Sequence, residues 1–251
     1  MKRFATLAYA VLVYLFFFAV FSYAIGFVAD AFVPKTIDTG GRGLAPAMAL
    51  CVDLGLLALF AVQHSLMARP GFKRVWTRIV PPAVERATYV LFSSLAMLAL
   101  FVFWEPIPVV VWSIGDPVLR AVVHTAHFGA WGLLLWATCM IDHLDLFGVR
   151  QALLHFRGRP HAKSLFSTPV LYRFVRHPIY VAWTLIFWTA PTMTAGHALF
   201  AFLCTAYILL AIPLEERDLV REFGDTYRTY RASTPALVPG LRGRAARGKA
   251  A

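Results

Sequence analysis

A short polar motif stands where a basic segment of the chain meets an apolar one. Residues 176–180 read Arg-His-Pro-Ile-Tyr and open an apolar run. The next apolar run ends in a second polar group, which extends from Glu215 to Asp218. If the two runs form a helical hairpin, both polar groups come to the same face of a membrane. The spacing therefore predicts a site at the membrane edge.

The side chains of these two groups suit an amphipathic ligand that carries an amino acid and a nucleoside. The carboxylates of Glu215 and Glu216 can accept hydrogen bonds from ribose hydroxyls or from an amino group. The cationic or donor groups of Arg176 and His177 can hold a carboxylate. Aromatic residues further along the chain could cover a flat base.

Each of these residues also has a purely structural explanation. Pro178 suits the first turn of a helix, and Arg176 can extend its side chain to lipid phosphates. Tyr180 is typical of the membrane interface, while Glu215 and Glu216 would favour the N-terminal end of a helix dipole. The combination, rather than any single residue, favours a binding site.

The composition identifies the broad class of protein. Of the 251 residues, 59% are hydrophobic and 15% are charged, whereas soluble domains are roughly 25% charged. We therefore expect an integral membrane protein. The net charge of +11 is explained by basic cytosolic loops beside anionic lipid. No basic patch with interleaved aromatic residues indicates nucleic-acid binding.

Six apolar segments are expected to enter the bilayer. They cover residues 4–33, 44–67, 88–104, 117–141, 178–190 and 197–212. Along the chain, loops rich in Lys and Arg alternate with loops that have few of these residues. Because basic loops stay on the cytosolic side, this alternation places both termini in the cytosol. The fifth segment is shorter than the roughly 20 residues of a full span, so it either thins the bilayer locally or forms a re-entrant hairpin with the sixth. The sequence predicts an all-α integral membrane protein with five to six transmembrane helices.

The pattern becomes amphipathic after Pro213. Leu219, Phe223, Tyr227 and Tyr230 fall on one stripe of a helix, so we expect one cytosolic amphipathic helix against the membrane. The linker before the hairpin is expected to contain a further surface helix. We divide the chain into an N-terminal membrane bundle (1–145), a core of linker, hairpin and amphipathic helix (146–239), and a disordered basic tail (240–251).

Two histidines raise the alternative of a metal, haem or transport protein. His124 and His127 share one helix face, but two ligands fall short of the usual set for a metal ion. His127 and Asp142 would lie roughly 22 Å apart on a straight helix, too far to bind one ion. We expect an interhelical hydrogen bond at the histidine pair and no metal site.

The C-terminal motifs resemble those of the membrane methyltransferases related to isoprenylcysteine carboxyl methyltransferase. The matching positions are 176–180, 215–219, 223–224, Tyr227, Tyr230 and Pro239. This resemblance implies S-adenosylmethionine as the cofactor. The residues expected to bind it are Tyr172, Arg176, His177, Pro178, Tyr180, Glu215, Glu216, Tyr227 and Tyr230. The chain departs from the family at Ala182, where glycine is usual, although alanine is small enough to keep a close approach.

Three further motifs resemble the bacterial methanethiol S-methyltransferases. They lie at residues 63–67, 142–151 and 187–197, so this resemblance covers most of the chain. It implies methyl transfer to methanethiol, giving dimethyl sulfide, by a protein of the bacterial inner membrane whose partners are a small thiol and membrane lipid. An apolar pocket would equally suit a prenylcysteine or a lipid substrate, so these alternatives stay open.

Methyl transfer to sulfur needs a base, because the thiolate is the nucleophile and a simple thiol is mostly protonated at neutral pH. The candidates at the cytosolic rim are His64, Asp142 and His143, with Arg150 as an electrostatic helper. Asp142 and His143 could equally end the fourth helix, and His64 could pack between helices. The sequence leaves the identity of the base open.

Overall fold

The protein is a bundle of long apolar helices, which confirms the predicted fold class. The computed structural model describes residues 1–161 and 166–240. Five helices are long and apolar enough to cross a membrane. They are α1 (Lys2–Ala29), α2 (Pro46–Ala68), α4 (Pro82–Phe103), α5 (Pro117–Met140) and α9 (Ala195–Phe223).

The fifth and sixth predicted segments form a hairpin of very unequal arms. Helix α8 (Pro178–Trp188) has 11 residues and is therefore roughly 16 Å long, about half of the ~30 Å hydrocarbon core. Its partner α9 has 29 residues. Four helices of the bundle, α2, α4, α5 and α8, begin with proline at the first turn, where the missing N–H costs no hydrogen bond.

Helix α9 continues through Pro213 to Phe223, so the predicted end of the sixth segment at residue 212 is wrong. Neighbouring helices can supply partners for the backbone groups that a proline frees in a membrane protein. The helix ends instead at Gly224, whose φ of 59° is a conformation that favours glycine. The predicted single amphipathic helix is therefore divided: Leu219 and Phe223 lie on α9, whereas Tyr227 and Tyr230 lie on α10 (Asp225–Ser233).

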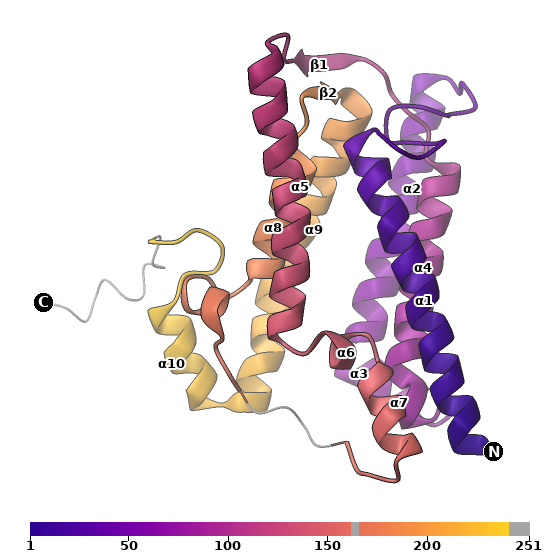
Figure 1. The fold of residues 1–251 in the computed structure, drawn as a ribbon, viewed down its shortest axis with the longest axis vertical. Coiled ribbons are helices and arrows are strands. Elements are labelled where there is room, and N and C mark those ends of the chain that lie inside the picture. Colours follow the sequence, from indigo (N-terminus) through magenta and orange to yellow (C-terminus); the bar gives the residue numbers. More distant parts are fainter. Residues whose placement is uncertain (162–165, 241–251) are drawn as a thin grey trace, which may run out of the picture.

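Short helices connect the spans at the lower end of the bundle in Figure 1. Helix α3 (Pro70–Trp76) joins α2 to α4. The linker after α5 contains α6 (His143–Leu146), α7 (Val149–Phe156) and the 3₁₀ turn η1 (Val170–Arg173), as expected for a linker with a helix of its own. Residues 162–165 of the linker and the predicted disordered tail from residue 241 onward lie outside the described residues.

A small antiparallel sheet closes the opposite end. Strand β1 (Val110–Ser113) pairs with β2 (Thr192–Thr194), which lies between the fifth and sixth predicted segments. The pairing joins residues about 80 positions apart and is not visible in local sequence pattern. Gly196 follows β2 and donates its N–H to Ile107 O at 3.1 Å. A Cβ at this position would come within 2.9 Å of Ile107 N, so only glycine fits without movement.

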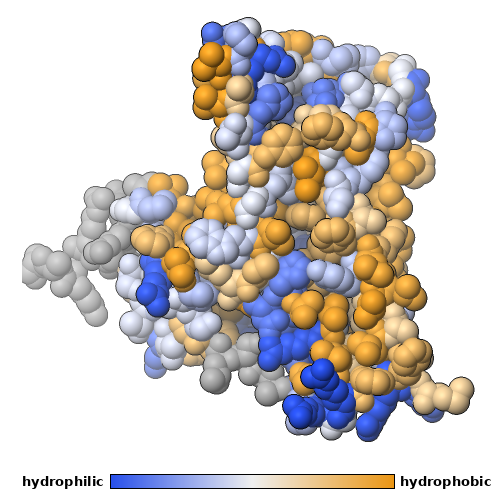
Figure 2. All heavy atoms as spheres, viewed as in Figure 1, coloured by the Kyte–Doolittle hydropathy of each residue, from blue (hydrophilic) through white to orange (hydrophobic). Residues whose placement is uncertain are grey.

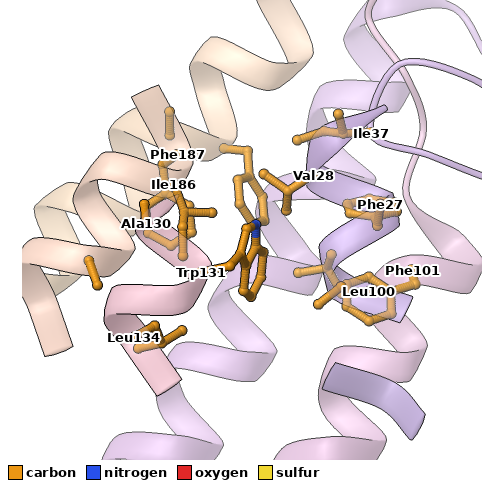
Figure 3. Packing of buried hydrophobic residues seen from close by; sticks show 14 of the residues in the cluster. Phe27, Val28, Ile37, Leu100, Phe101, Ala130, Trp131, Leu134, Ile186 and Phe187 are labelled. Carbon is orange, nitrogen blue, oxygen red and sulfur yellow. The ribbon is translucent and has the colours of Figure 1, made fainter. Parts of the chain in front are cut away.

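The helices form two groups that share one apolar core. Helices α1, α2 and α4 pack together, and α5 packs along α8, which pairs with α9 (Figure 1). Between the groups lies the indole of Trp131, with Phe187 on one side and Val28, Phe27 and Leu100 on the other (Figure 3). On the face in Figure 2, hydrophilic residues gather at the two ends and hydrophobic residues between them, as expected for a membrane-spanning bundle.

Candidate functional site

The Arg-His-Pro motif is held in place by the segment that follows α10. The backbone N–H of Arg176 donates to Pro235 O at 2.9 Å, and that of His177 donates to Ala236 O at 3.1 Å. Pro178 then begins α8 and is buried. The chain after α10 therefore fixes the motif at the base of the hairpin.

A buried ion pair joins the two predicted polar groups. Glu216 Oε1 lies 2.7 Å from Arg176 Nε and 2.6 Å from Arg176 Nη2, and both side chains are about nine-tenths buried. Arg176 Nη1 also donates to the carbonyl oxygens of Arg231 and Thr234. These bonds satisfy a guanidinium that would be costly to bury unpaired. Arg176 and Glu216 are thus occupied with each other and with α10.

The neighbouring side chains leave one carboxylate open. His177 Nε2 lies 3.1 Å from Glu216 Oε1, and the His177 ring stacks on Tyr180 with centroids 5.4 Å apart. The Tyr180 hydroxyl donates to Glu215 Oε2 at 2.7 Å. The Glu215 side chain is 44% exposed, so its other oxygen can accept a further hydrogen bond.

Three tyrosines lie near these charged groups and interact with them electrostatically. The Tyr230 hydroxyl donates to the carbonyl oxygen of Tyr172, and Phe166 packs on Tyr227 and Tyr230 at 5.9 and 5.4 Å. Burial raises the pKa of Tyr230 to about 12 and also raises that of Tyr227. Both phenols are therefore protonated donors at neutral pH. The Tyr227 hydroxyl is buried and has no hydrogen-bond partner in the described part of the chain.

A series of hydrogen-bonded polar side chains inside the membrane bundle, here called the polar chain, was not predicted from the sequence. The Tyr89 hydroxyl lies 2.9 Å from His64 Nε2, and Ser93 Oγ lies 3.2 Å from His64 Nδ1. One residue further along α2, Ser65 Oγ lies 2.9 Å from the Tyr207 hydroxyl of α9. An available signal was the presence of two tyrosines in otherwise apolar helices, since intramembrane polar groups are usually functional.

The polar chain extends toward the hairpin base. Tyr180 lies within electrostatic range of Tyr207 and Tyr89, and Tyr207 lies within range of Glu215. Among the candidate bases, His64 bonds to Tyr89, which in turn interacts electrostatically with Tyr180 of the motif.

The other three candidates gather around α6. Asp142 forms an ion pair with Arg150 and caps α6 by accepting from Asp145 N at 3.1 Å. The His143 ring bonds to the Tyr14 hydroxyl at 2.9 Å and to Thr138 Oγ1 at 3.0 Å. No contact joins this group to the Arg176–Glu216 pair within residues 1–161 and 166–240. All thirteen site assignments stay predictions.

The structure gives other predicted residues ordinary structural roles. His127 Nδ1 lies 3.1 Å from Thr189 O, which is the expected interhelical hydrogen bond. Ala182 is fully buried in the apolar core. No group of three or more His, Cys, Asp or Glu side chains in the described residues has the arrangement of a metal site.

Comparison with known proteins gives a consistent family. The family described as a protein of unknown function, DUF1295, matches residues 85–234. Methanethiol S-methyltransferase 1 of Bradyrhizobium diazoefficiens is 48% identical over 237 residues, 94% of this chain and 83% of that protein. Methanethiol S-methyltransferase of Mycobacterium tuberculosis is 48% identical over 240 residues, 95% of this chain and 98% of that protein.

A more distant relative is human nurim, which is 35% identical over 187 residues, 70% of this chain and 69% of nurim. No solved structure matches. The fold and the cluster around Arg176 define an all-α integral membrane protein with a polar site at one end of its helical bundle. The chain belongs to the methanethiol S-methyltransferase family.

Proposed function

We propose that this protein transfers the methyl group of S-adenosylmethionine to the sulfur of methanethiol, forming dimethyl sulfide. Relatives at 43–49% identity over about 95% of the chain carry the name methanethiol S-methyltransferase. The observation that carries the donor site is the open carboxylate of Glu215, which the Tyr180 hydroxyl holds at 2.7 Å beside the buried Arg176–Glu216 pair.

The residues at the hairpin base fit the donor chemically. The free oxygen of Glu215 can accept from a ribose hydroxyl or an ammonium group. The buried, unpartnered hydroxyl of Tyr227 can donate to a carboxylate or to a base nitrogen, and the ring of Tyr230 can stack on adenine. Arg176 and Glu216 act behind them by holding α8, α9 and α10 together. When bound, S-adenosylmethionine supplies a methyl group already activated on a sulfonium.

We assign proton removal from the thiol to His64. The methanethiol S–H bond breaks and its proton passes to the His64 ring, which Tyr89 and Ser93 orient. The thiolate lone pair forms the new S–CH₃ bond as the donor's C–S bond breaks, so the products are dimethyl sulfide, S-adenosylhomocysteine and one proton. Asp142 is a weaker candidate because Arg150 already neutralises it, and His143 remains the second candidate.

An apolar acceptor agrees with the surroundings of the motif. A hollow of about 190 Å³ lies beside Pro178 and is lined by apolar side chains, including Leu133, Val181 and Leu237. A small thiol dissolved in lipid could enter the protein there. We place the protein in the bacterial inner membrane. Both termini lie in the cytosol in this proposal, because loops rich in Lys and Arg alternate along the chain accordingly. We also keep the proposed division into residues 1–145 and 146–239.

The test uses detergent-purified protein with S-adenosylmethionine and methanethiol, and dimethyl sulfide is measured in the headspace. We expect cofactor-dependent dimethyl sulfide, no product without protein, and less product from Glu215→Gln. A farnesylated cysteine is offered in a parallel reaction. Methylation of the farnesylcysteine without dimethyl sulfide would contradict the assigned substrate, and no methylation of either acceptor by folded protein would contradict the activity.

A further inference from the structure

A polar cavity of about 360 Å³ is lined by residues of α3, α4, α6 and the linker through α7. The short helices α3, α6 and α7 lie at the lower end of the bundle in Figure 1. Its polar lining consists of Lys73, Glu85, Arg86, Asp145, Gln151 and His161. None of the residues predicted to bind the cofactor or to act as the base lines this cavity. It therefore needs an explanation of its own.

Part of the lining is already paired. His161 Nε2 lies 2.7 Å from Asp145 Oδ1, and Arg86 Nε donates to Leu146 O at 2.9 Å. The same guanidinium lies 5.1 Å from the centre of the Tyr89 ring. These contacts fix α6 to the start of α4 and shape the cavity wall. The remaining N–H groups of Arg86 have no hydrogen-bond partner in residues 1–161 and 166–240.

Two other groups are not satisfied. The Lys73 ammonium has no hydrogen-bond or salt-bridge partner among the residues that the structure describes, and burial lowers its pKa, with the neighbouring charge of Arg86 acting in the same direction. Gln151 Oε1 is buried without a partner in the same part of the chain. Glu85 and Glu222 both attract the Lys73 ammonium electrostatically. The cavity thus offers an unpaired cation on one side and acceptors on the other.

The surroundings of the cavity are those of a membrane interface. Val75 and Ile79 follow Lys73 and are 59% and 76% exposed, and Ile141 in the cavity wall is 37% exposed. Exposed aliphatic side chains on a short helix between two membrane spans are suited to contact with acyl chains. A ligand of this cavity can therefore have both a charged head and an apolar body.

We infer that the cavity binds the headgroup of a zwitterionic phospholipid, with the phosphate on Lys73 and Arg86 and the ammonium on Glu85 and Gln151. A phosphate carries the strong acceptors that Lys and Arg prefer, and an ammonium supplies the donors that the unpaired Gln151 oxygen lacks. Phosphatidylethanolamine has both groups. The inference does not depend on the proposed methyl transfer, because none of the residues assigned to the donor or to the base lines the cavity.

Native mass spectrometry of the detergent-purified protein tests this inference, with phosphatidylethanolamine and phosphatidylglycerol supplied in equal amounts. We expect wild type to retain phosphatidylethanolamine in preference to phosphatidylglycerol. The Lys73→Ala variant should retain at least tenfold less phosphatidylethanolamine than wild type. Arg74→Ala is the matched control, because Arg74 is exposed on the same helix and does not line the cavity. Glu85→Gln should keep lipid binding but lose the preference for phosphatidylethanolamine.

A thermal-shift series distinguishes binding of a lipid from binding of a free zwitterion. The soluble zwitterions added in this series are O-phosphoethanolamine and methionine. Equal phosphatidylethanolamine retention by wild type and Lys73→Ala, each eluting as folded protein, would overturn the inference. So would stabilisation by methionine in a protein that retains no phosphatidylethanolamine.

Discussion

Glu216 Oε1 is shared by Arg176 Nε at 2.7 Å and His177 Nε2 at 3.1 Å, so one oxygen connects the two residues that immediately precede α8 to the polar end of α9. Both the carboxylate and the guanidinium are buried. Removal of one partner from a buried pair leaves an uncompensated charge, which typically costs about 3–5 kcal/mol.

We therefore expect Glu216→Ala to lower the free energy of unfolding by about 3–5 kcal/mol, measured by thermal or denaturant unfolding in detergent. The double variant Arg176→Met, Glu216→Leu removes both charges and should recover much of that loss, while remaining inactive. If Glu216→Ala were as stable as wild type, the pair could not be the element that organises the hairpin base.

Tyr180 tests the donor site with less damage to the fold. Tyr180→Phe removes only the hydroxyl that donates to Glu215 at 2.7 Å, a charge-assisted bond worth about 1.5–3 kcal/mol. We expect affinity for S-adenosylhomocysteine to fall roughly tenfold or more at 1.4 kcal/mol per decade. Tyr23→Phe is the control, because Tyr23 bonds to Lys35 O far along the chain from the motif. Equal affinity in all three proteins would count against the assigned site.

His64 and His143 make different predictions for the base. His64→Gln should lower kcat by about 10²–10⁴, the usual contribution of general base catalysis, and leave cofactor affinity unchanged. His143→Gln should lower kcat by much less, because its ring is joined to Tyr14 and Thr138 rather than to the chain that leads to Tyr180. Single-turnover rates of the two variants decide between them, and the reverse order would make His143 the base.

The pH dependence of stability gives a separate signature for His143. Burial lowers the pKa of this histidine, so the folded protein favours the neutral ring. The stability that this burial allows is complete above the unfolded pKa of about 6.5 and is lost as the pH falls below it. The thermal midpoint should drop between about pH 7 and about pH 5, and His143→Gln should show a smaller drop. Identical pH profiles would contradict the account.

The packing around the β1–β2 sheet can be tested by substituting Gly196, which directly follows β2. In Gly196→Ala, the new Cβ would come within 2.9 Å of the Ile107 backbone nitrogen, and such overpacking typically costs about 1–3 kcal/mol. Gly129→Ala is the control, because nothing lies within 4 Å of its Cβ position and alanine favours helix by up to roughly 1 kcal/mol. Unfolding measurements should show the two substitutions acting in opposite directions.

Local pattern was enough to predict the helices and the polar groups at their ends. The apolar runs of about 20 residues placed α2 and α5 to within two residues, whereas α4 begins six residues before its predicted start and α9 continues eleven residues beyond its predicted end. Pro213 and the β1–β2 pairing were not predictable in the same way. The cost of a proline depends on which neighbouring helices satisfy the freed backbone, and strand pairing over about 80 residues depends on the finished bundle.

The candidate site shows the same division. The motifs predicted that Arg176, His177, Tyr180, Glu215 and Glu216 would share one neighbourhood, and the structure brings them into direct contact. The sequence could not distinguish the paired Glu216 from the open Glu215, because adjacent residues point to different sides of one helix. The sequence likewise could not identify Tyr89 and Ser93 of α4 as the partners of His64, because these contacts depend on how α2 packs against α4.

Calorimetry with S-adenosylhomocysteine tests the central claim most directly. Wild type and Glu215→Gln are compared in the same detergent, with Glu85→Gln as the control because that carboxylate lies in the separate cavity. The account predicts one binding site in wild type and Glu85→Gln, and at least tenfold weaker binding in Glu215→Gln. Equal affinity in all three proteins, or no binding by folded wild type, would contradict it.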